Sequence, residues 1–114
     1  MDFDTLNGDD LNRAIAARLR WREITPGKWL RPLDHNSTPR MVMTKLSNWA
    51  DHPGFAMQHL IDDHFGFTIS YDPSGVLLLW FDSGESRSFE GEQAWHQLQL
   101  TLIRAWLKWR AEKA

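Results

Sequence analysis

The clearest pattern of apolar and polar positions lies in residues 65–81, which read FGFTISYDPSGVLLLWF. Apolar residues alternate with small or polar ones from Phe65 to Tyr71, and this is the period of a β-strand with one apolar face. Residues 72–75 then predict a turn, because Asp, Pro and Gly occupy its first, second and fourth positions. The run from Val76 to Phe81 contains no polar residue, which predicts a strand covered on both faces or central in its sheet.

This hairpin is predicted to extend into a small sheet and to supply part of the core. Residues 82–85 carry a second turn signal, and residues 86–89 are compatible with a third strand. We expect truncation of Trp80 to Ala to cost about 3–5 kcal/mol, as for other large-to-small core changes. The side chains that we expect in the core are those of Phe67, Ile69, Leu78 and Trp80.

Three segments space their apolar residues as helices do. The first predicted helix covers residues 9–20, and the second covers residues 51–64, where Pro53 suits the first turn. The third covers residues 91–110 and is apolar over more than half of its circumference. Together these segments predict an α+β fold, in which a small antiparallel hairpin or three-stranded sheet packs between helices as helix–sheet–helix layers.

Residues 23–50 show no clear period and are predicted to be irregular. Residues 29–31 are read as a short edge strand that ends at Pro32, since proline cannot donate to a sheet ladder. A polar loop is expected at residues 33–40, followed by a short apolar anchor at residues 41–43.

The order helix, Trp-bearing loop, helix, hairpin, long apolar helix resembles the phage ABA-sandwich family. The residues that carry the resemblance are those at 11–16 (LNRAIA) with Trp21, at 49–53 (WADHP), in the two strands of the hairpin and at 98–107. The resemblance implies a small accessory protein of a phage or prophage, without a catalytic residue, that acts by binding host machinery. This chain departs from the family pattern in its longer polar loop at residues 31–45 and in its extended tail with Trp106 and Trp109.

Length and composition narrow the class of protein. A chain of 114 residues predicts one domain, residues 1–114. The absence of cysteine excludes a disulfide framework, a thiolate metal site and a cysteine nucleophile, and it favours a reducing cytoplasm, here that of a bacterial host. The first ten residues are acidic and do not resemble a signal peptide. The longest apolar run has six residues, so we expect no membrane span.

Charge is segregated along the chain although the net charge is only −2. Residues 13–45 carry eight basic groups against two acidic ones, whereas residues 51–92 carry eight acidic groups against one basic one. Two interpretations stay open. The blocks neutralise each other in the fold, or they form a bipolar surface that steers a charged partner.

The residues with catalytic or metal-binding potential are few. His52 and His59 stand seven apart, and His59 has helical spacing to Asp63. The spacing is not that of the HExxH motif and supplies no third ligand, so a hydrolase or metal enzyme on these residues is the least favoured interpretation. We therefore expect no catalytic residue, no metal and no cofactor.

The candidate binding site is an aromatic and basic cluster near the end of the chain. Such a cluster suits a protein interface, and the partner is predicted to be a second copy, giving a homodimer, or a host protein. The competing interpretation is a core helix whose cations complement its dipole. The predicted interface residues are Trp106, Lys108, Trp109 and Arg110.

The alternative function is association with nucleic acid through the basic segment. The isoelectric point near 6.2 argues against general attraction to phosphates, so this function is the second choice. The contacts predicted for it are Arg13, Arg20, Arg31, Arg40 and Lys45.

Overall fold

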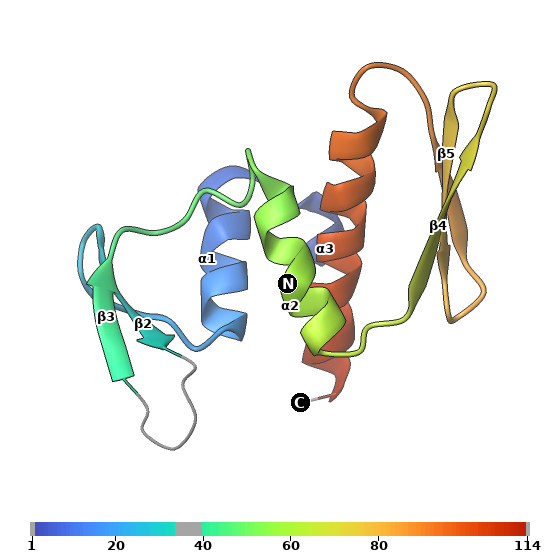
Figure 1. Ribbon diagram of the computed structural model, residues 1–114. Coiled ribbons are helices and arrows are strands. Elements are labelled where there is room, and N and C mark those ends of the chain that lie inside the picture. Colours follow the sequence, from blue (N-terminus) through green and yellow to red (C-terminus); the bar gives the residue numbers. More distant parts are fainter. Residues whose placement is uncertain (1, 34–39, 114) are drawn as a thin grey trace. The chain divides into compact units, whose positions relative to one another are not determined.

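The computed structural model describes residues 2–33 and 40–113 (Figure 1). It contains three α-helices and two three-stranded antiparallel sheets, so the predicted α+β class is confirmed. The chain divides into two compact units, Thr5–His52 and Pro53–Ala114 with Met1–Asp4, which we call the N-unit and the C-unit. The single domain, residues 1–114, stays a prediction.

The N-unit consists of one helix followed by a sheet that the sequence did not predict. A 3-10 turn, η1 (Phe3–Thr5), precedes helix α1 (Gly8–Arg18), which matches the first predicted helix. The prediction of an irregular segment at residues 23–50 was wrong up to residue 44, because three strands lie there in the order β1-β2-β3. The polar loop expected at residues 33–40 lies largely outside the described residues, and residues 45–48 form no regular element. The strands are β1 (Arg22–Thr25), β2 (Lys28–Leu33) and β3 (Arg40–Thr44).

Pro32 does not end its strand, although the sequence suggested that it would. Strand β2 is central rather than an edge, and Pro32 pairs with Met41 of β3. The last residue of β2 that pairs with β1 is Leu30, so β2 has an open side beyond that point. Proline is tolerated at such an edge-like position, where no ladder partner is lost on the open side.

A buried asparagine connects α1 to the end of the N-unit. Asn12 is 4 % exposed, and its Oδ1 accepts a hydrogen bond from the backbone N–H of Ala50 at 2.8 Å. Its Nδ2 donates to Oδ1 of Asn48 at 3.3 Å. The apolar stripe of the same helix, Leu11 and Ile15, is fully buried. Asn12 thus satisfies a backbone donor that burial would otherwise leave without a partner.

The C-unit contains the predicted hairpin and third strand. Its sheet has the order β4-β5-β6, with strands β4 (Phe67–Asp72), β5 (Val76–Phe81) and β6 (Ser86–Phe89). The predicted turn forms, because Gly75 N–H donates to the Asp72 carbonyl at 2.8 Å and Ser74 N–H donates to Asp72 Oδ1 at 3.0 Å. Gly75 has a φ of +100°, a conformation in which glycine avoids a side-chain clash.

Two helices complete the C-unit. The predicted second helix is shorter than expected and begins with a 3-10 turn, η2 (Pro53–Ala56), which leads into α2 (Met57–Asp62). The third predicted helix is α3 (Ala94–Lys113), and it lies against α2 and against β5 and β6 (Figure 1). Leu98, Leu102 and Ile103 of α3 are fully buried. Within the described residues, no helix combines the length and apolar character needed to cross a bilayer.

The hairpin faces the opposite way from the prediction at one important residue. Leu79 is fully buried, whereas its neighbour Trp80 is 46 % exposed, so the assignment of Trp80 to the core was wrong. Successive side chains of a strand point to opposite faces, and Leu79 shares a face with Ile69, whereas Trp80 shares the other face with Thr68. The remaining residues expected in the core, Phe67, Ile69 and Leu78, are half-buried.

Helices α1 and α2 end in the same way. After α1, Arg20 has a φ of +67°, and the N–H groups of Arg20 and Trp21 donate to the carbonyls of Ala17 and Ala16. After α2, His64 has a φ of +57°, and the N–H groups of His64 and Phe65 donate to the carbonyls of Ile61 and Leu60. Both are Schellman caps, in which the left-handed position is usually glycine.

Candidate functional site

The predicted interface residue Trp106 lies inside the C-unit rather than on its surface. Its ring is fully buried, and its Nε1 donates a hydrogen bond to Oδ2 of Asp63 at 2.8 Å. A buried indole needs such an acceptor, and Asp63 supplies it from the residue that follows α2. Because its ring is buried, Trp106 cannot contact a partner and is not part of the candidate interface.

Of the other predicted interface residues, Trp109 and Arg110 contact other parts of the C-unit, and Lys108 is exposed. The Trp109 ring packs on Phe65 with centroids 5.2 Å apart, and Lys113 Nζ lies 4.2 Å from the centroid of the same ring. Arg110 Nε is 3.9 Å from Asp63 Oδ2, which makes a weak ion pair. These contacts fasten the end of α3 to the α2–β4 connection, and the use of Lys108, Trp109 and Arg110 as an interface stays a prediction.

A second surface, which the sequence analysis missed, is the face of the β4-β5-β6 sheet opposite Leu79. We call it the outer face. Trp80 lies across from Thr68 on β4 and from Ser86 on β6, and Leu78 lies across from Ser70 and Ser88 in the same manner. The outer face thus has an apolar row along its central strand between two rows of hydroxyl groups. Its side chains are those of Thr68, Ser70, Asp72, Val76, Leu78, Trp80, Ser86 and Ser88.

The outer face is almost free of charge. In this sheet, all of which the structure describes, the one charged side chain on that face is Asp72 in the turn. Hydrogen bonding from the backbone N–H of Ser74 lowers the pKa of Asp72. A surface of this composition offers apolar contact and neutral hydrogen-bonding groups, and it gives no electrostatic attraction for a polyanion.

The outer face was within reach of sequence reasoning. A hairpin turn with Gly at its fourth position has a three-residue loop, here residues 73–75, so Asp72 pairs with Val76. Counting back along β4 and forward along β5 from this pair places Thr68 opposite Trp80. Because Thr68 belongs to the polar face of β4, Trp80 must belong to that face as well. The assignment of Trp80 to this face is not obvious from β5 alone, because a strand without polar residues suggests that both faces are covered.

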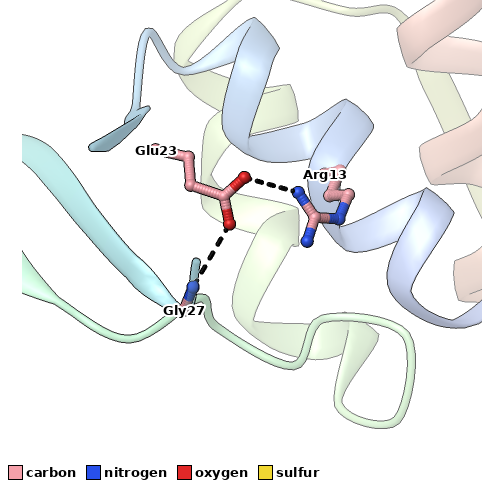
Figure 2. A network of polar contacts seen from close by, with 3 residues as sticks. All are labelled: Arg13, Glu23 and Gly27. Atoms are coloured by element: carbon pink, nitrogen blue, oxygen red, sulfur yellow. Dashed lines mark hydrogen bonds and ion pairs between the residues drawn. The ribbon is translucent and has the colours of Figure 1, made fainter. Parts of the chain in front are cut away.

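The basic residues predicted to contact nucleic acid belong to the N-unit, and Arg13 is already paired. Its Nη1 is 3.0 Å from Oε1 of Glu23, and its guanidinium lies 5.5 Å from the Trp29 ring centroid. Figure 2 shows Glu23 between Arg13 and the backbone N–H of Gly27, which donates to Oε2 at 3.3 Å. The hydrogen bond from Arg13, with that from Gly27, lowers the pKa of Glu23, and Glu23 raises the pKa of Arg13.

The other basic residues have separate positions in the N-unit. Arg20 is exposed at the Schellman cap, Arg31 is exposed on β2, and Lys45 is exposed directly after β3. Arg40 begins β3, and its side chain lies outside the described part of the structure. The N-unit carries a net charge of +3, from eight basic and five acidic residues, and residues 53–114 carry a net charge of −3.

The histidines and the aspartate considered for metal binding do not belong to a cluster of possible metal ligands in the described part of the chain. His52 precedes α2 and belongs to the N-unit, whereas His59 and Asp63 belong to the C-unit. The Asp63 carboxylate already accepts from Trp106 and faces Arg110. Among the described residues, no group of three or more His, Asp or Glu side chains could hold a metal ion.

Comparison of the chain with protein-family models, with curated proteins and with solved structures finds no match in any of the three. The resemblance to the phage ABA-sandwich family therefore stays a prediction.

Proposed function

We propose that this protein is a non-enzymatic binding module that recognises another protein through the outer face. The observation that carries the proposal is Trp80, which is 46 % exposed in the central strand of its sheet. Tryptophan, with tyrosine and arginine, is enriched where protein interfaces have their strongest contacts. Leu78 beside it extends the apolar row, and the hydroxyl groups of the two outer strands can satisfy polar groups of a partner.

The wider role proposed for this module is that of a phage or prophage accessory protein in the cytoplasm of a bacterial host. The resemblance stated above supports this role, and the absence of cysteine agrees with a reducing compartment. The partner is then a host protein, and a defence component that the module inhibits is the leading candidate. Neither a cofactor nor a catalytic residue is part of the proposal.

Two tryptophans of the C-unit allow a matched test. Trp80 on the outer face and Trp95 in the first turn of α3 are 46 % and 49 % exposed. Wild type, Trp80→Ser and Trp95→Ser are used to capture proteins from a bacterial host lysate, and captured proteins are identified by mass spectrometry. We expect a partner that Trp95→Ser retains and Trp80→Ser loses. Loss with Trp95→Ser alone would contradict the outer face as the binding site.

Nucleic-acid binding remains the alternative function, supported by the net charge of +3 on the N-unit. It predicts an affinity for DNA or RNA that falls steeply with salt. Arg31→Glu would then weaken binding, whereas Trp80→Ser would leave it unchanged. An electrophoretic mobility shift with both variants separates the two functions.

A further inference from the structure

Strand β4 is an unprotected sheet edge. It is six residues long, pairs with β5 without a register shift, and contains neither proline nor a basic residue. Natural proteins usually protect an edge with lysine, proline, a bulge or short length. The opposite edge, β6, is four residues long, carries Arg87 and lies against α3. Of the two edges of this sheet, β4 is therefore the one that can accept another strand.

The side of β4 that faces the helix layer also lacks cover. Helix α3 lies against β5 and β6, and Tyr71 of β4 is left 68 % exposed. Ile69, which points to the same side of the sheet, is half-buried. An additional strand beside β4 would bring side chains against both residues, because directly opposed residues in an antiparallel pair lie about 4.5–5.5 Å apart.

We propose that the protein forms a dimer in which β4 pairs antiparallel with β4 of a second copy. A two-fold axis at Ser70 places Ile69 opposite Tyr71 of the partner subunit and Thr68 opposite Asp72 of the partner subunit. The first pair is aliphatic on aromatic, and the second gives a hydroxyl donor to a carboxylate. Slipping the register by one residue would instead put Thr68 opposite Tyr71 of the partner subunit and mix polar with apolar faces.

The unpaired backbone groups of β4 favour a second copy at the edge over two copies stacked through the outer face. Edge pairing gives these N–H and C=O groups hydrogen-bond partners, which stacking does not, and it leaves the outer face free. It joins two outer faces into one surface of a six-stranded sheet, with Trp80 of each copy on the same side.

This inference deepens the proposed function by doubling the surface offered to a partner, but its test needs no partner. Two exposed hydroxyl residues of β4 are replaced in the variant Thr68→Lys/Ser70→Lys. The matched control is Ser86→Lys/Ser88→Lys, which places the same charges on exposed hydroxyl residues of the same face at the other edge. Mass in solution is measured by light scattering and sedimentation over a wide range of concentration.

We expect wild type and the β6 control to have twice the 13.4 kDa chain mass at high concentration, and the β4 variant to stay at the chain mass. Circular dichroism checks that both variants are folded. A wild type that is monomeric up to millimolar concentration overturns the proposal. So does a dimer that survives the β4 substitutions, or one that the β6 substitutions abolish equally.

A cysteine reporter tests the axis even if the lysine variant does not fold. The chain contains no cysteine, so Ser70→Cys introduces a single thiol. At the proposed axis this thiol faces its own copy within reach of a disulfide or a short thiol crosslinker. Ser70→Cys should therefore give a covalent dimer under oxidation, and Ser88→Cys on β6 should not. Equal yields from the two variants would contradict the β4 edge.

Discussion

The two sheets of this protein each carry a tryptophan in their central strand, and the two rings have opposite surroundings. Trp29 in β2 is 6 % exposed, with the Arg13 guanidinium against its ring, whereas Trp80 in β5 is 46 % exposed among hydroxyl side chains. Both sheets have three antiparallel strands in chain order. The difference teaches that a central strand does not bury a side chain by itself, since burial follows the face that a helix covers.

The largest expected effect is on Trp29. Replacing it with Thr removes a buried ring and should lower the free energy of unfolding by about 3–5 kcal/mol. Urea denaturation followed by circular dichroism measures the change. A loss below about 1 kcal/mol would show that the N-unit does not depend on this ring and would break the comparison.

The next effect concerns the buried polar contact of the N-unit. Asn12→Leu keeps the size of the side chain but leaves the Ala50 N–H without its acceptor, which should cost about 1–3 kcal/mol. Asn48→Leu is the control, because Asn48 is exposed and the backbone contact stays in place. Equal losses in urea denaturation would mean that the contact to Ala50 is not the important one.

Trp80 completes the comparison of the two rings. Trp80→Thr replaces the ring with a hydroxyl side chain like those of the two neighbouring strands, and threonine is favourable in strands. We expect a loss of about 1 kcal/mol, a third or less of the loss for Trp29→Thr, because about half of the ring is already in water. A loss as large as that of Trp29→Thr would place Trp80 in a core after all.

The two Schellman caps predict gains in stability. Arg20→Gly and His64→Gly remove a side chain from a left-handed position, and each should raise the free energy of unfolding by about 0.5–1 kcal/mol. Ala17→Gly, within α1, is the opposite control and should lower it by a similar amount. Thermal unfolding of the three variants resolves the signs.

The smallest effect is the pH dependence of the Arg13–Glu23 pair. The pKa of Glu23 is lowered in the folded protein, so its contribution is present above the ordinary value of 4.5 and is lost as the pH falls through the lowered pKa. The difference in stability between wild type and Glu23→Gln should therefore shrink as the pH falls below 4.5. A difference that grows on acidification would contradict the direction of the shift.

The C-unit was predictable to the extent that its information is local. The turn at Asp72–Gly75, the alternation before it and the spacing of apolar residues in α3 all lie within short stretches, and the hairpin formed as expected. The N-unit sheet lacks such signals. Strand β1 has a register shift between Glu23 and Thr25, and β2 contains a proline. These strands are defined by pairing with each other rather than by any pattern of their own.

The candidate site shows the same limit. The burial of Trp106 depends on a carboxylate 43 residues away, at Asp63, and helical spacing cannot reveal that contact. The outer face was different, because the turn sets the register and the register sets the face of Trp80. Local information was sufficient there, although the uninterrupted apolar run of β5 suggests burial on both faces.

Every strand pair in both sheets joins neighbours along the chain, and this has a consequence for how fast the protein folds. The pairs are β1–β2, β2–β3, β4–β5 and β5–β6. Closing a short loop costs little chain entropy, and proteins dominated by such contacts cross their folding barrier quickly. On a ribosome, each sheet has all its strands as soon as its own segment has emerged, so β4, β5 and β6 can pair before α3 packs against them.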